Sequence, residues 1–157
     1  MDATTNGLHR HDLFARLNVD EIKQLDKFSH IVDYAKGDSV FKLQDKCSHI
    51  YMLMEGTVHL MLPDRGQELN LAFARVIRNE IFGLSALMNH SQYTAEARCI
   101  SGCRVMAIEA KPLLQLLEEN KTVGFDIVSA VSRIYYHRYL QMLTKLQDIV
   151  SQVTVLP

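Results

Sequence analysis

The chain has 157 residues, of which 48% are hydrophobic and 22% charged, the mix of an ordinary globular domain. Lys and Arg total 17 against 18 Asp and Glu, and this balance argues against a strongly basic nucleic-acid-binding domain. No apolar run reaches the roughly 18 residues of a membrane span, and the polar start, residues 1–10, lacks the apolar region of a signal peptide. We therefore expect one cytoplasmic domain with no membrane partner.

The N-terminal part of the chain is predicted to be helical. A first short helix is expected over residues 8–17. Asn18 then stands three residues before Glu21, the spacing of a capping box, and apolar residues follow at helical spacing. The sequence therefore predicts a second helix over Val19–Lys27.

The segment from Phe28 to Ile108 is predicted to be mainly β. Short runs rich in β-branched and aromatic residues are separated by turns that contain Gly or Pro. These runs are residues 39–43, 49–54, 57–62, 68–74, 93–100 and 104–108. Seven or eight short strands joined by hairpin turns indicate a β-sandwich or β-roll.

Residues 81–88 interrupt this β pattern. We expect a strand to stop there, the chain to turn at Gly83 and about one turn of helix to follow. The first N–H groups of a helix have no partner within the helix, and this arrangement suits an anion, phosphate above all.

After Ile108 the pattern is helical. Pro112 suits a helix start, and Asn120 and Gly124 indicate a break. From Phe125 to about Gln152 there is no Pro or Gly, which predicts a helix roughly 40 Å long. Apolar or tyrosine positions recur at alternating spacings of four and three, as in a coiled coil. The predicted seam comprises Val128, Tyr135, Tyr139, Met142, Leu146 and Ile149. Part of this stripe should cover the β domain and the remainder should face a second copy in a homodimer.

The three cysteines do not suggest a metal site. Cys99 and Cys103 flank a predicted turn at residues 101–102, there is no CxxC, and Cys47 is far away in sequence. A structural metal site needs three or four ligands. We expect free, mostly buried thiols, with a redox pair as the alternative.

Three runs carry a family resemblance: residues 34–41 (YAKGDSVF), 50–60 (IYMLMEGTVHL) and 81–88 (IFGLSALM). They resemble the cyclic-nucleotide-binding domain family, which includes the catabolite activator protein and FNR-type regulators, and the likeness covers about residues 13–150. It implies an α+β, mainly β fold: an eight-stranded β-roll (jelly roll) with short N-terminal helices, a cassette helix and a long C-terminal helix. It also implies a division into a roll with its following short helix, residues 1–120, and a dimerising signalling helix, residues 121–157.

The family grips the cyclic phosphate with a phosphate-binding cassette, Phe-Gly-Glu-(Leu/Ile)-Ala-Leu followed after a gap by Arg-(Ala/Ser/Thr)-Ala. Backbone N–H groups and the Arg bind the phosphate, and the Glu accepts from the ribose 2′-hydroxyl. The equivalent residues here are Phe82, Gly83, Leu84, Ser85, Ala86, Leu87, Tyr93, Thr94 and Ala95.

Both charged positions of the cassette are changed, because Leu84 replaces the Glu and Tyr93 replaces the Arg. Each lost contact is worth about 1.5–3 kcal/mol, so cyclic nucleotides should bind weakly. Arg98 should point to the opposite face of the strand from Tyr93. Arg75 or Arg78 could supply a replacement cation.

The long helix should contribute to the same pocket. In cAMP-binding relatives its residues contact the base, and the equivalent positions fall near Arg138 and Tyr139, with Tyr135 and Tyr136 close by. The tyrosines could pack the dimer seam and the roll, or stack on a ligand ring.

These features predict a regulatory small-molecule sensor with cAMP or cGMP as its nominal ligand. One alternative is a haem-based gas sensor, whose axial ligand would come from the histidines; no CxxCH for covalent attachment is present. The candidate axial ligands are His9, His11, His30, His49, His59, His90 and His137. A second alternative is a dimerisation module without a ligand, so the cofactor is left unknown.

Catalysis and direct DNA binding are not expected. No GxSxG, HExxH or Walker pattern is present, and no carboxylates form a catalytic pair. The DNA-reading members of the family carry a helix-turn-helix after the long helix, whereas this sequence stops at Pro157. The sequence is therefore expected to be a free-standing sensor domain or one that lacks its C-terminal part.

Overall fold

The computed structural model describes residues 13–15, 17–62, 71–88 and 90–152, and in these ranges the strands form two four-stranded antiparallel sheets. One sheet has the order β1-β8-β3-β6 and the other the order β2-β7-β4-β5. The strands are β1 (Ser29–Tyr34), β2 (Ser39–Phe41), β3 (His49–Glu55), β4 (Val58–Met61), β5 (Ala72–Val76), β6 (Ile81–Phe82), β7 (Glu96–Cys99) and β8 (Cys103–Glu109). The predicted mainly β roll of eight strands is confirmed.

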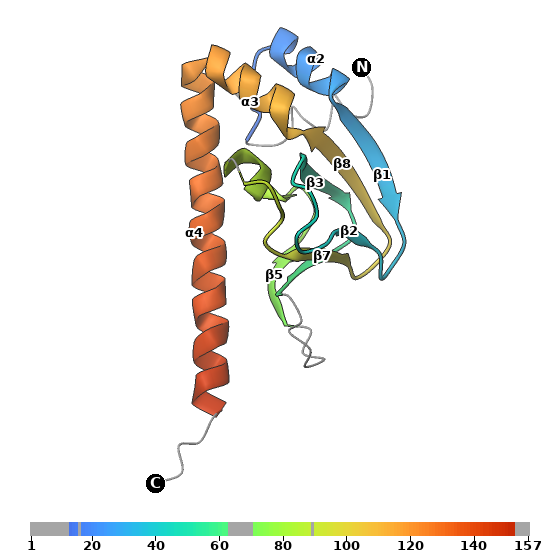
Figure 1. Ribbon diagram of the computed structural model, residues 1–157, viewed down its shortest axis with the longest axis vertical. Coiled ribbons are helices and arrows are strands. Elements are labelled where there is room, and N and C mark those ends of the chain that lie inside the picture. The colour runs from blue at the N-terminus through green and yellow to red at the C-terminus, as the bar shows by residue number, and fades with distance from the viewer. Residues whose placement is uncertain (1–12, 16, 63–70, 89, 153–157) are drawn as a thin grey trace.

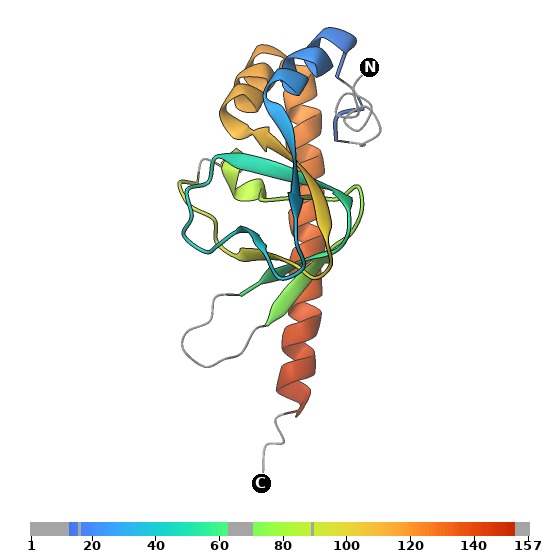
Figure 2. The same ribbon diagram turned by 90° about the vertical axis from the view of Figure 1, so that its right-hand side faces the viewer.

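The helices surround this roll on two sides. They are α2 (Val19–Lys27), the 3₁₀ helix η1 (Leu84–Met88), α3 (Ala110–Glu119) and α4 (Lys121–Gln152). Figures 1 and 2 show α2 and α3 at one end of the roll, and α4 running beside the roll and past its far end. No helix in the described ranges is both long enough and apolar enough to cross a membrane.

Two clusters of buried side chains hold these parts together. One lies between the sheets and includes Phe41, Phe82 and Tyr93. The other joins the first sheet to the helices and includes Leu84 of η1 and Ile127 of α4. The first half of α4 is thus attached to the roll by hydrophobic packing.

The start of α2 agrees with the prediction from its capping box. The Asn18 side chain accepts hydrogen bonds from the N–H groups of Asp20 and Glu21, both at 2.9 Å. The Glu21 carboxylate accepts from the Asn18 N–H at 2.8 Å. The predicted helix over residues 8–17 lies mostly outside the described residues, and residues 13–15 form a turn.

Two β segments differ from the predicted runs. β5 begins at Ala72 and ends at Val76, later than the predicted 68–74, of which residues 68–70 lie outside the described ranges. β7 begins at Glu96 and not at Tyr93. The Tyr93 backbone instead pairs with a loop, accepting from the Gln44 N–H and donating to the Asp45 carbonyl oxygen, both at 3.0 Å.

The predicted start of the long helix at Phe125 is wrong, because α4 begins at Lys121. The break between α3 and α4 is at Asn120 alone, whose side chain accepts from the Val123 N–H at 3.3 Å. A Cβ atom on Gly124 would lie 2.6 Å from the Leu117 carbonyl oxygen. Gly124 therefore permits a close approach of α4 to α3 and does not interrupt the helix.

Candidate functional site

The predicted turn at Gly83 is confirmed. β6 stops at Phe82, Gly83 adopts a φ of +72°, and η1 follows at once. A Cβ atom at position 83 would lie 2.9 Å from Cδ2 of the Tyr51 ring. Both the left-handed backbone and the close ring require glycine here, so this residue fixes where the chain leaves the sheet.

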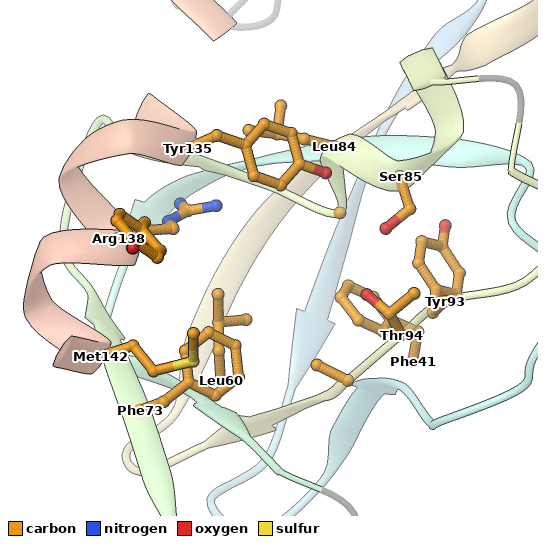
Figure 3. Close-up of a pocket in the computed structure, with 13 residues that line it drawn as sticks. Phe41, Leu60, Phe73, Leu84, Ser85, Tyr93, Thr94, Tyr135, Arg138 and Met142 are labelled. Carbon is orange, nitrogen blue, oxygen red and sulfur yellow. The ribbon is translucent and has the colours of Figure 1, made fainter. Parts of the chain in front are cut away.

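A cavity of about 290 Å³ lies between this turn, the second sheet and α4. We call it the cassette cavity; Figure 3 shows side chains of α4 on one side of it and side chains of the roll on the other. It is lined by Phe41, Leu60, Phe73, Gly83, Leu84, Ser85, Tyr93, Thr94, Ala95, Tyr135, Arg138, Tyr139 and Met142. Most of these groups are apolar or aromatic.

Six of the nine predicted cassette residues line this cavity, namely Gly83, Leu84, Ser85, Tyr93, Thr94 and Ala95. The other three do not. Phe82 is fully buried between the sheets, while Ala86 is buried and Leu87 partly buried in the core under the helices. These three residues support the turn from behind.

Tyr93, at the position of the family's Arg, is part of the core. Its side chain is 3% exposed and its ring stacks on Phe41 with centroids 3.9 Å apart. Its hydroxyl donates to the His49 carbonyl oxygen at 2.7 Å and accepts from the His49 N–H at 3.3 Å. Burial raises the pKa of this phenol, so it stays neutral.

Leu84, at the position of the family's Glu, is 2% exposed and packs in the core under the helices. A leucine side chain has no hydrogen-bond acceptor. The roll therefore contributes neither a cation nor a carboxylate at the two positions that carry them in the family.

A cation enters the cassette cavity from α4 instead. The Arg138 guanidinium projects into the cavity in Figure 3 and also donates to the Ile81 carbonyl oxygen. Burial lowers the pKa of Arg138, whereas Glu80 and Tyr135 raise it. Because the pKa of a free guanidinium lies far above neutral pH, Arg138 keeps its positive charge. Burial raises the pKa of Tyr135, and the neighbouring Ser85 lowers it. Ser85, Tyr135 and Arg138 thus form a small polar group in an apolar cavity.

The other arginines considered from the sequence lie elsewhere. Arg98 forms a salt bridge with Glu96, with Nη2 3.0 Å from Oε1, and does not line the cavity. Arg75 lines a different cavity, and Arg78 lines neither. The cation of the cassette cavity is thus Arg138, which the family resemblance placed near the base of a cyclic nucleotide and not near its phosphate.

The predicted seam residues divide into two groups. Tyr135, Tyr139 and Met142 line the cassette cavity yet remain 40–50% exposed. Val128, Leu146 and Ile149 are exposed and line no part of that cavity. Tyr136 is also exposed and lies outside the cavity.

Among the described residues, neither histidine nor cysteine lines the cassette cavity. His137 lines another cleft, and His9 and His11 fall outside the described ranges. The three cysteines are free, and burial raises the pKa of Cys99 to about 12 and that of Cys47 to about 11. No group of three His, Cys, Asp or Glu suited to a metal ion occurs in the part of the chain that is described.

Comparison with known proteins agrees with this geometry. The sensor domain of the transcriptional regulator DNR from Pseudomonas aeruginosa is 22% identical, with a TM-score of 0.72 over 98% of this chain and 95% of that one. A candidate cyclic nucleotide-binding protein from Geobacter metallireducens is 25% identical, with a TM-score of 0.73 over 88% of this chain and 99% of that one. The N-terminal domain of a transcriptional regulator from Streptomyces coelicolor is 26% identical, with a TM-score of 0.63 over 83% and 93%.

A search of curated protein sequences gave no match. The model of one family, the cyclic nucleotide-binding domain, matches residues 31–120, more than half of the chain. The chain therefore belongs to the cyclic nucleotide-binding domain family, a family of ligand-binding domains and not of enzymes, which confirms the predicted resemblance and the predicted lack of an enzymatic role.

Proposed function

We propose that this domain is the effector-binding part of a homodimeric regulatory protein and that its effector occupies the cassette cavity. The observation that supports this is the shared wall: Tyr135, Arg138 and Tyr139 of α4 line the same cavity as the cassette turn. An effector held there touches the roll and the helix together. Residues 1–120 then sense the effector, and residues 121–157 pass the signal on.

The lining favours an effector that combines a planar ring with one acidic group. The partly exposed rings of Tyr135 and Tyr139 offer stacking surfaces, and Arg138 offers one cation. Cyclic nucleotides have this composition, so cAMP and cGMP are the nominal ligands. Since Leu84 offers no acceptor to a ribose hydroxyl, their affinity should be lower than in domains that keep the Glu and the Arg.

The exposed stripe on α4 supports the homodimer. Val128, Leu146 and Ile149 keep 52, 56 and 43% of their surface exposed although they belong to the alternating four-and-three pattern of a coiled-coil seam. A parallel copy of α4 would bury them. Tyr135 and Tyr139 stand where this stripe meets the cavity, so an effector would alter the surface offered to the second copy.

The first experiment titrates cAMP and cGMP into the protein by calorimetry, with the melting temperature as a second readout, since a ligand of the folded state must raise it. We expect saturable binding that falls about tenfold or more in Arg138→Gln and stays unchanged in Arg78→Gln, an arginine outside the cavity. Neither heat nor a melting shift at millimolar nucleotide would reject cyclic nucleotides as the effector.

A dimerisation module without a ligand is the second candidate, because Leu84 and Tyr93 are both buried in the core. Sedimentation of the protein with and without nucleotide separates the two, since a ligandless module dimerises equally in both. An absorbance scan of the purified protein tests the haem alternative. A cytoplasmic location and the lack of direct DNA binding remain predictions.

A further inference from the structure

A second cavity, of about 370 Å³, lies between the β5–β6 segment and α4. We call it the outer cleft; its polar lining includes Arg75, Asn79, Glu80, Arg133, His137 and Arg138. With 3.6 residues per turn, Arg133 and His137 form one row along α4, four residues apart, and Tyr135 and Tyr139 form a row on the other side. Arg138 stands between the two rows and lines both cavities.

Two arginines of the outer cleft have no charged or hydrogen-bonded partner among the described side chains. Within the described residues, neither Arg75 nor Arg133 forms a salt bridge or a side-chain hydrogen bond, although both line the cleft. The carboxylate that lines it, Glu80, accepts from the Ile77 N–H at 2.9 Å and so engages its own loop. Three guanidinium groups thus face one carboxylate in a concave region, which produces a potential that attracts anions.

The floor of the outer cleft is apolar. Ile81 is 1% exposed and Leu13 is 5% exposed, and Ile134 is partly buried beside them. The His137 ring nitrogen lies 3.2 Å from the Gln141 amide nitrogen at the rim. A volume near 370 Å³ is within the range of small-molecule pockets, about 300–1,000 Å³.

We propose that the outer cleft is a second ligand site and takes a small organic anion. Arg75 and Arg133 would hold its phosphate or carboxylate group, and its apolar body would pack on Ile81 and Ile134. This site is separate from the cassette cavity and shares only Arg138 with it. It also stays open in a dimer formed through Val128 and Leu146, because those residues lie on the other side of α4.

The test uses phenyl phosphate, which joins a phosphate to an apolar ring, and calorimetry at constant ionic strength. We expect saturable binding in the submillimolar range and weaker binding of inorganic phosphate, which lacks the ring. Benzoate serves as the carboxylate counterpart. If phenyl phosphate binds more tightly the site prefers phosphate, and if benzoate does the site prefers carboxylate.

Substitutions then locate the probe. Arg75→Gln combined with Arg133→Gln should weaken binding of phenyl phosphate about tenfold or more. Arg78→Gln removes the same kind of charge from a residue that lines neither cavity, and it should leave the affinity within about twofold. The two single variants are measured as well, so that a double variant that fails to fold does not end the test.

Three results would overturn the proposal. One is the lack of saturable binding up to about 10 mM phenyl phosphate. Another is an equal loss in Arg78→Gln, which would mean non-specific attraction to net charge. The third is a loss in Tyr139→Ser with none in the double variant, because the probe would then occupy the cassette cavity; a circular dichroism melt confirms that each variant is folded.

Discussion

The two walls of the cassette cavity differ in how firmly they are fixed. On the roll side, Leu84 and Tyr93 are 2 and 3% exposed and belong to the hydrophobic cores. On the helix side, Tyr135 and Tyr139 are 40 and 50% exposed. Leu84 and Tyr93 therefore serve the fold, whereas the helix wall is free to serve a ligand or a second copy. Substitutions in the two walls should separate stability from recognition.

The largest effect is expected from removing an aromatic ring of the roll wall. Phe41 is 6% exposed and stacks on Tyr93, Tyr51 and Phe82, so Phe41→Ala should lower the free energy of unfolding by about 3–5 kcal/mol. Urea unfolding measures this. Phe125→Ala, at a residue 73% exposed on α4, should change it by less than about 0.5 kcal/mol. Similar losses in both variants would mean that the burial of Phe41 in the roll wall does not set its contribution to stability.

A smaller effect is expected at the turn that places the roll wall. Gly83→Ala puts a Cβ atom 2.9 Å from the Tyr51 ring at a φ of +72°, which should cost about 1–3 kcal/mol of unfolding free energy. Gly37→Ala is the matched control, because Gly37 also has positive φ, +93°, but no atom within 4 Å of the added Cβ. Urea unfolding of both variants should show the larger loss at Gly83, and equal losses would exclude a contribution from Tyr51.

Removing one hydroxyl from the roll wall should cost less again. Tyr93→Phe keeps the stacked ring but leaves the His49 carbonyl oxygen without its 2.7 Å hydrogen bond, at a cost of about 1 kcal/mol. Tyr136→Phe, on the exposed side of α4, is the control and should be neutral. Thermal melts of the two variants suffice, and a neutral Tyr93→Phe would mean that water replaces the bond.

Acid should weaken the roll at His49, whose backbone holds the Tyr93 hydroxyl. Burial lowers the pKa of His49, nearby His30 lowers it further, and Glu109 raises it. Because the folded state then binds the proton less readily than the unfolded chain, stability is full above about pH 6.5 and falls as the pH drops from there towards the folded-state pKa. Burial also lowers the pKa of His59, so His49→Gln should reduce this slope without abolishing it. Urea unfolding across this range measures the slope, and an unchanged slope would exclude His49.

The smallest effect on chain stability is expected beyond the cavity, on the exposed stripe of α4. Leu146→Glu should dissociate the proposed dimer, as seen by sedimentation velocity, while the unfolding free energy of the single chain changes by less than about 0.5 kcal/mol. Thr144→Glu adds the same charge on the side of α4 away from the stripe and should leave the dimer intact. A dimer that survives both substitutions does not use this stripe.

Local patterns were sufficient for some of these elements and not for others. The limits of α2 were predicted correctly because its capping box lies within four residues. The predicted start of α4 is wrong because a glycine in a sequence resembles a helix break. In the structure, a Cβ atom on Gly124 would lie 2.6 Å from the Leu117 carbonyl oxygen of α3. Whether a glycine breaks a helix or admits a neighbour depends on a contact that the sequence does not display.

The two cavities also combine features that the sequence predicts with contacts that it does not display. Tyr93 and Leu84 were placed at the cavity by family pattern, but the hydrogen bond from Tyr93 to His49 spans 44 residues and was not foreseen. The outer cleft has no signature in the sequence, since Arg133 and His137, four residues apart, look like an ordinary solvated helix face. The cleft forms only when the β5–β6 segment packs beside that face.

Arg138 belongs to both cavities, and a single guanidinium cannot give its full charge to two anions at once. If Arg138 contacts an anion in both cavities, an anion in one lowers the affinity of the other, and thermodynamic reciprocity makes the two reductions equal. A domain built in this way would respond to the ratio of two metabolites and not to the concentration of one.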